Sequence, residues 1–92
     1  MKTLFLTIKH HWFNEILSGR KTEEYRAIKK YYIQKFTNKI YDKIILQAGY
    51  SKDAPKLEAE IKSIEIKTRT FDLFSFDVYV IKLKNAKIIE KS

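Results

Sequence analysis

The 92-residue sequence contains no cysteine, one proline and only two glycines. Without cysteine the chain cannot form a disulfide or a thiolate metal site, which suits a reducing compartment. Two glycines are too few for a glycine-rich phosphate loop, so the common nucleotide-binding motifs are excluded. No stretch approaches the roughly 20 apolar residues of a membrane span. The apolar stretch 4–8 is too short for a signal peptide. We therefore expect a soluble cytoplasmic protein without membrane contact.

Histidine is also scarce, with two residues that are adjacent, His10 and His11. On a helix their side chains point about 100° apart, and on a strand they point to opposite faces. No carboxylate or further histidine follows at the spacing of a metal site, so we expect no metal and no cofactor. Both are typical polar residues at the start of a helix. His11 stays a candidate ligand-binding residue because it lies where a strand gives way to a helix.

What the chain does contain is apolar and basic. Hydrophobic residues make up 45% of it, including six tyrosines, six phenylalanines and one tryptophan, enough for the core of a single domain over residues 1–92. Nineteen lysines and arginines against eleven acids give a net charge of +8. A positive field of this size in a small domain favours polyanions, nucleic acid above all. The alternative is a lysine-rich composition without functional meaning.

Two short helices are predicted in the N-terminal half. Residues 10–18 place Trp12, Phe13, Ile16 and Leu17 at helical spacing, so these four side chains are expected in the core. Gly19 then supplies the left-handed residue that ends such a helix. A second helix is indicated by the four-residue recurrence of apolar side chains within residues 28–36.

Five or six strands are predicted around these helices. The segments are 4–8, 21–26, 42–48, 57–66, 76–83 and 86–89. The first of them is expected to be buried on both faces for part of its length. The apolar residues change parity after Ser63, which indicates a bulge or bend. The strand 86–89 would follow a turn at Asn85. We expect an α+β fold, with a small, mainly antiparallel β-barrel of five to six strands and two short helices.

The polar segment "GRKTEEYR", residues 19–26, joins the first helix to the next strand. Lys21 and Glu24 lie three residues apart in it. A lysine and a glutamate in contact shift each other's pKa, as general acid–base catalysis requires, but they also pair on ordinary protein surfaces. Strict strand alternation would separate the two side chains. We therefore expect Lys21 to precede the regular strand and to pair with Glu24 in a cleft.

The same segment resembles the G-x-K-T-x-E-x-R signature of the ASCH domain, a branch of the PUA-like superfamily. Gly19, Lys21, Thr22, Glu24 and Arg26 match it. The preceding "LTIKHHWFNEILSG" is similar to that family's first strand and helix. The resemblance implies a PUA-like barrel with a cleft that holds RNA or a nucleotide-like ligand. The candidate ligand-binding residues are Lys21, Thr22, Glu24, Arg26, Tyr25, Tyr50 and His11.

Three functions remain open at this point. The first is a monomeric module that binds RNA or a nucleotide-like small molecule. The second is a hydrolase that acts on modified nucleosides or RNA through Lys21 and Glu24. One ASCH branch consists of amidohydrolases with a lysine and a threonine nucleophile; Lys21 matches that lysine, whereas Glu24 stands at the position of the threonine. The third is an accessory protein whose ligand is another protein.

Overall fold

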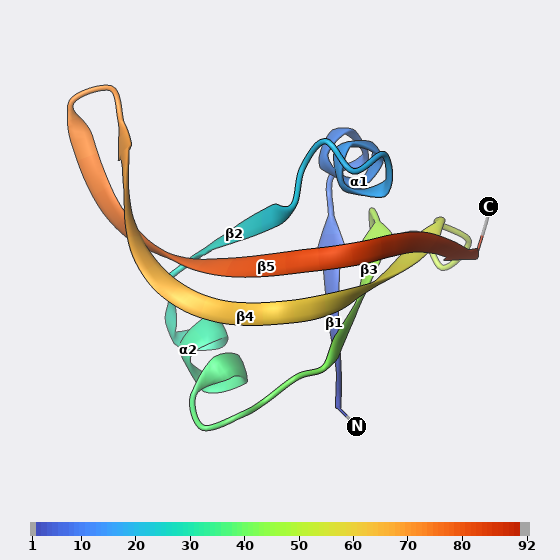
Figure 1. Ribbon diagram of the computed structural model, residues 1–92, viewed down its shortest axis with the longest axis horizontal. Coiled ribbons are helices and arrows are strands. Elements are labelled where there is room, and N and C mark those ends of the chain that lie inside the picture. Colours follow the sequence, from blue (N-terminus) through green and yellow to red (C-terminus); the bar gives the residue numbers. More distant parts are fainter. Residues whose placement is uncertain (1, 91–92) are drawn as a thin grey trace.

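Five strands form one mixed sheet, and two short helices lie beside it (Figure 1). The computed structural model describes residues 2–90, apart from the side chains of Phe71 and Glu90. The elements are β1 (Thr3–Ile8), α1 (His10–Leu17), β2 (Glu23–Ala27), α2 (Lys30–Phe36), β3 (Lys43–Ala48), β4 (Lys56–Phe71) and β5 (Phe74–Glu90). The predicted α+β class and both helices are confirmed. Over residues 2–90, no helix is both long and apolar enough to cross a membrane.

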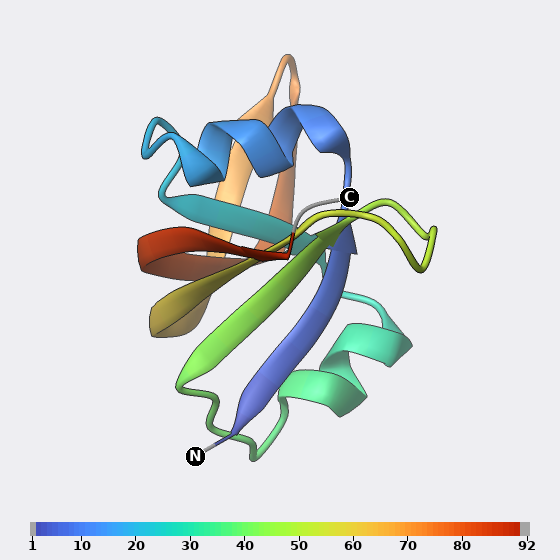
Figure 2. The same cartoon turned by 90° about the vertical axis from the view of Figure 1, so that its right-hand side faces the viewer.

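The sheet is curled but open. Its strand order is β1-β3-β4-β5-β2, in which β1 and β3 run parallel and every other pair is antiparallel. β1 and β2 are therefore its two edges, and Figure 2 shows how the curl brings both toward α1. In the described part of the chain, no ladder of backbone hydrogen bonds joins these two edges. The side chain of Arg26 in β2 reaches across instead and donates to the carbonyl of Thr7 in β1. The expected barrel is not closed, because β1 and β2 are bridged by the Arg26 side chain and are not paired through their backbones.

The curl comes from the long hairpin of β4 and β5. Its register shifts at three places, the last between Ile61 and Ser63, which confirms the bulge predicted from the parity change. The expected turn at Asn85 is wrong, since β5 continues through it to Glu90. Asn85 takes a left-handed conformation (φ 56°) within the strand, and its side-chain amide donates to Glu60 at 2.6 Å. Asparagine tolerates this conformation better than most residues do, so the strand bends here and does not end.

The core lies on one face of the sheet. β1 and β3 alternate regularly, with Leu4, Leu6 and Ile8 buried on β1 and Ile44 and Leu46 on β3. The intervening residues point away from the core. Phe5 is 61% exposed, so the expectation that β1 is buried on both faces is wrong. β1 is an edge strand with α2 near it (Figure 2), and its outer face is left uncovered at Phe5.

Each helix adds apolar side chains to this core. Phe13 and Ile16 of α1 are buried and Leu17 is partly buried, as predicted. Trp12 is 44% exposed, so its predicted burial is wrong. It lies about 100° around the helix from Phe13, on the flank of the apolar face. In α2, Phe36 is buried and its ring contacts that of Tyr79 edge-on at 4.8 Å.

Candidate functional site

The end of α1 positions Lys21. Gly19 has a φ of 85°, the left-handed conformation predicted for it, and its N–H donates to the carbonyl of Ile16. The chain then folds back, and the N–H of Lys21 donates to the carbonyl of Glu15 at 3.0 Å. Lys21 therefore lies at the end of the helix, two residues before β2 begins at Glu23. It is free of the strand's alternation, as the pairing prediction requires.

β2 directs Glu24 and Arg26 to the same side. Glu24 pairs in register with Ile81 of β5, and Arg26 with Tyr79. Both partners are core residues, and Glu24 is only 7% exposed, the one buried charged side chain in the part of the chain that the structure describes. Tyr25 points to the opposite side, where its hydroxyl donates to Glu23 at 2.7 Å. An acid and a base two residues apart are thus both directed inward.

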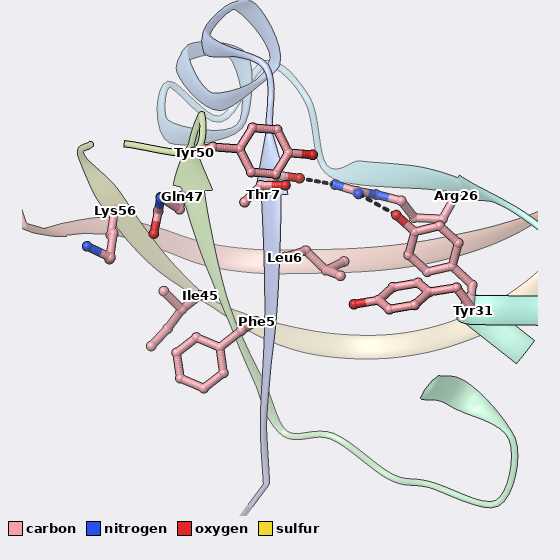
Figure 3. A pocket seen from close by; sticks show the side chains of 10 residues that line it. Phe5, Leu6, Thr7, Arg26, Tyr31, Ile45, Gln47, Tyr50 and Lys56 are labelled. Carbon is pink, nitrogen blue, oxygen red and sulfur yellow. Dashed lines mark hydrogen bonds between the residues drawn. The ribbon is translucent and has the colours of Figure 1, made fainter. Parts of the chain in front are cut away.

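All three guanidinium nitrogens of Arg26 are hydrogen-bonded, and Nη2 connects the two edges of the sheet. Nε lies 2.9 Å and Nη2 2.8 Å from Oε2 of Glu24. Nη2 also donates to the carbonyl of Thr7 at 2.8 Å, and Nη1 donates to the hydroxyl of Tyr32 at 3.0 Å. Figure 3 shows the last two bonds as dashed lines. The planar guanidinium is thereby fixed, and it fixes the Glu24 carboxylate in turn.

The ammonium of Lys21 lies between two aromatic rings. Nζ is 4.9 Å from the ring centre of Trp12 and 4.8 Å from that of Tyr25, both within cation–π range. It is 4.0 Å from Oε1 of Glu24, an ion pair too long for a hydrogen bond. The predicted pairing of Lys21 with Glu24 is therefore confirmed. Arg26 holds Oε2, and Oε1 is the carboxylate oxygen nearer to the Lys21 ammonium.

Burial sets the protonation behaviour of Glu24. Desolvation raises the pKa of this carboxyl. Its attraction to Arg26 and Lys21 and its hydrogen bonds from Arg26 and from the Tyr25 backbone N–H oppose the rise without cancelling it. Glu23, on the exposed side of the same strand, behaves in the opposite way. The hydrogen bond from Tyr25 lowers the pKa of Glu23. Two adjacent glutamates are thus shifted in opposite directions by their surroundings, a pattern associated with functional sites.

These groups border a cleft of about 910 Å³. It is lined by Thr7, Ile8, Lys9, His10, Trp12, Lys21, Glu24, Tyr25, Arg26, Ala27, Lys29, Tyr32, Gly49 and Tyr50. We call it the main cleft. It extends between the ends of β1 and β2, where the open edges of the sheet face each other. A volume in the range of roughly 300–1,000 Å³ is typical of small-molecule sites.

Five of the seven residues predicted to bind a ligand meet at this cleft: Lys21, Glu24, Tyr25, Arg26 and Tyr50. The other two do not. Thr22 is exposed and lines a neighbouring pocket that shares Trp12, Lys21 and Tyr25 with the main cleft. Its carbonyl accepts from the N–H of Leu83. His11 lies on the outside of α1 against the ring of Trp12, and His10 lines the cleft in its place. Adjacent residues on a helix face different ways, and sequence alone does not choose between them.

Other lining residues were missed by sequence reasoning. Trp12 was expected in the core, yet it contacts Lys21 in the cleft. Lys9 and Lys29 line the cleft from the residues just before α1 and α2. Their signal in the sequence was only their position at helix starts. Tyr32 belongs to both the core and the cleft, because its ring stacks on the core residue Phe36 while its hydroxyl accepts from Arg26.

Residues 2–90 contain no group of three histidine, cysteine, aspartate or glutamate side chains that could hold a metal ion. The chemistry available to the site is that of a carboxylate, cations and aromatic rings. Comparison with protein-family models, curated proteins and solved structures finds no match to this chain. A functional assignment must therefore come from the cleft itself.

Proposed function

We propose that this protein is a binding module for single-stranded RNA or a nucleotide-like molecule, which it holds in the main cleft. The observation that carries the proposal is the convergence of three kinds of group at one cavity. A buried carboxylate, several cations and four aromatic side chains all line it. Nucleotides combine a hydrogen-bonding base edge, an anionic phosphate and an apolar ring face, and each kind of group suits one of these.

The aromatic side chains support binding of a base. Trp12, Tyr25, Tyr32 and Tyr50 come from different parts of the chain and line the same cavity. Tyr50 is 89% exposed and Trp12 is 44% exposed, so part of each ring is accessible. Unpaired bases stack on such rings, and one stacked base contributes about 1–3 kcal/mol to binding. An exposed tyrosine and tryptophan beside a cavity are more readily explained by a ligand than by the core.

Glu24 supports recognition of a base edge. Its Oε2 accepts from Arg26, Oε1 lies 4.0 Å from Lys21, and Glu24 is one of the residues that line the main cleft. A carboxylate oxygen accepts from exocyclic amino groups such as the N4 amine of cytosine. Because Arg26 fixes the carboxylate before the ligand arrives, the Glu24 side chain loses little conformational freedom on binding. Glu24 therefore favours bases that present an amino group.

Lysines around the cleft support the phosphate contact. Lys9, Lys21 and Lys29 all line it, in a chain of net charge +8. Lys9 and Lys29 are exposed and can approach a phosphate without being desolvated first. Lysine–phosphate contacts release counterions and make the affinity salt-dependent. The resemblance of "GRKTEEYR" to the ASCH signature, with the PUA-like RNA cleft that it implies, agrees with this proposal.

A second function, hydrolysis of RNA or of a modified nucleoside, is favoured by one observation. Burial raises the pKa of Glu24 beside the Lys21 ammonium, and a carboxyl with a raised pKa can act as a general acid or base. Thr22 does not strengthen this candidate, since its side chain lies at another pocket. The hydrolase is therefore placed second, with Lys21 and Glu24 as its catalytic candidates.

The test is a titration of fluorescein-labelled eight-nucleotide RNAs followed by fluorescence anisotropy at low salt. The parent protein should bind, and Lys21→Ala and Glu24→Gln should each weaken binding by at least fivefold. Lys39→Ala is the matched control, because Lys39 is exposed and outside the main cleft. Recovered RNA is analysed for cleavage, and N4-acetylcytidine is incubated separately to detect released acetate.

Each outcome decides something. Binding by the parent protein without cleavage or acetate release supports the module. Turnover that both substitutions abolish, while binding persists, supports the hydrolase in its place. If the parent protein fails to bind the RNAs at low salt, the proposed function is wrong. It is also wrong if Lys39→Ala weakens binding as much as Lys21→Ala, since the charge and not the cleft would then be responsible.

A further inference from the structure

A second pocket of about 330 Å³ adjoins the main cleft. We call it the side pocket. It straddles β1, as Figure 3 shows: Phe5, Ile45 and Gln47 lie on one side of the strand, and Arg26 and Tyr31 lie on the other. Phe5 belongs to the outer face of β1, which the core does not use. The side pocket therefore exists because the outer face of the edge strand β1 is uncovered.

The two cavities are neighbours that share part of their lining. Thr7, Arg26, Tyr32 and Tyr50 line both of them. Arg26 and Tyr32 are joined by the 3.0 Å hydrogen bond, so together they form a fixed partition between the cavities. A ligand that fills the main cleft and continues past this partition enters the side pocket. A ligand that occupies both cavities therefore needs two parts joined by a linker that passes the partition.

The side pocket repeats the chemistry of the main cleft on a smaller scale. Phe5 is 61% exposed and Tyr31 is 60% exposed, so each offers a ring to a planar group. Gln47 donates from Nε2 to the carbonyls of Gly49 and Ser51, which uses its donor group and leaves Oε1 as an acceptor. Two exposed rings and an amide oxygen suit a second base.

We propose that the site binds two consecutive nucleotides of a single strand, with one base in the main cleft and its neighbour in the side pocket. This inference rests on the proposed function and gives it a substrate class: an oligonucleotide and not a free nucleotide. The backbone between the two bases passes the Arg26–Tyr32 partition. Stacking of the second base on Phe5 and Tyr31 adds affinity that a mononucleotide cannot obtain.

The experiment compares the four 5′-mononucleotides with the four matching dinucleoside monophosphates by isothermal titration calorimetry at 150 mM salt. A dinucleoside monophosphate carries one negative charge, whereas a 5′-mononucleotide carries between one and two at pH 7. Tighter binding of the dinucleoside therefore cannot come from charge. We expect at least one base for which the dinucleoside binds about tenfold more tightly than the mononucleotide.

Phe5→Ala tests the second base, and Phe74→Ala is its matched control. Both are phenylalanines of similar exposure, 61% and 66%, and Phe74 lies outside both cavities. Phe5→Ala should reduce the ratio of dinucleoside to mononucleotide affinity about tenfold, and Phe74→Ala should leave the ratio unchanged. Circular dichroism spectra that match the parent protein establish that each variant is folded.

The possible results separate this inference from the proposed function. If mononucleotides and dinucleosides bind equally and Phe5→Ala changes neither, the two-nucleotide inference is overturned while the proposed function stands. If neither class of ligand binds, the two-nucleotide inference is overturned, and the titration with eight-nucleotide RNAs at low salt decides the proposed function. If Phe74→Ala lowers the ratio as much as Phe5→Ala, the side pocket is not the second site and the inference is overturned.

Discussion

Arg26 donates a 2.8 Å hydrogen bond to the backbone carbonyl of Thr7, and through it the side chain of one edge strand reaches the backbone of the other. The same guanidinium holds the buried Glu24. Arg26 is therefore both a structural connection across the open side of the sheet and the fixed partner of the cleft carboxylate. Stability and ligand binding are coupled at this residue.

Removal of the Arg26 charge should destabilise the fold. Arg26→Met leaves Glu24 buried without its closest charged partner, and loss of one partner of a buried pair costs roughly 3 kcal/mol. The measurement is urea denaturation at neutral pH. Arg20→Met is the control, because Arg20 forms an exposed pair with Glu15 and should change the midpoint little. Equal effects of the two substitutions would contradict the structural role of Arg26.

A double-mutant cycle gives a sharper test of the same pair. When Glu24→Gln is added to Arg26→Met, the unpaired buried charge is removed. The double variant should therefore lose less stability than the sum of the two single losses, by about 1 kcal/mol or more. Strict additivity of the two single losses would show that the 2.8 Å contact has no energetic weight.

The raised pKa of Glu24 predicts a particular dependence of stability on pH. A raised pKa in the folded state means that the protonated carboxyl is favoured by folding. The contribution of Glu24 is then fully present below its unfolded pKa, near 4.3, and is lost as the pH rises through its folded pKa. Glu24→Gln does not titrate, so the stability of the parent relative to this variant should fall as the pH rises above the unfolded pKa.

The comparison of the parent with Glu24→Gln is needed because other glutamates change the stability with pH in the opposite direction. The pKa values of Glu23 and Glu65 are lowered by hydrogen bonds from Tyr25 and Lys82, so their contributions are lost as the pH falls. Both are present in parent and variant and cancel in the difference. Urea unfolding at a series of pH values provides the measurement, with a carbon-13 NMR titration of Glu24 as an independent check. A difference that grows with pH would refute the raised pKa.

Trp12 and Phe13 should differ sharply in their importance to stability. Phe13 is 3% exposed, and Phe13→Ala should cost about 3–5 kcal/mol through the cavity that it leaves. Trp12 is 44% exposed, and Trp12→Ala should cost only about 1 kcal/mol. Thermal unfolding of the two variants tests this contrast. Because Trp12 is the only tryptophan, its fluorescence in the parent protein should also change when RNA binds. Comparable losses of stability would place Trp12 in the core after all.

Salt should weaken RNA binding in proportion to the phosphates contacted. For single strands the slope of log affinity against log salt is about −0.7 for each phosphate neutralised. Lys29→Gln should reduce the magnitude of this slope by about 0.7, because Lys29 lines the main cleft and is exposed. Lys39→Gln, outside the cleft, should leave the slope unchanged. A parent slope near zero would exclude phosphate contacts.

Local sequence patterns predicted most of the secondary structure. The alternation in residues 4–8, the apolar run in residues 42–48, the helical spacing in residues 10–18 and the parity change after Ser63 all correspond to features of the structure. These features depend on neighbours a few residues away, which the sequence contains directly. The predicted turn at Asn85 was wrong, because the strand paired with β5 decides whether a left-handed residue ends a strand or bends it.

Within the candidate site, sequence determined that Lys21 follows a glycine-ended helix and that Glu24 and Arg26 share a strand face. Those relationships are local, and the structure confirms them. Tertiary structure alone decided that Trp12 faces Lys21, that Tyr32 reaches Arg26, and that β1 and β2 remain unpaired edges. Each depends on how elements distant in the chain pack together, and the exposed flank of a helix or the open edge of a sheet is defined only by what packing leaves uncovered.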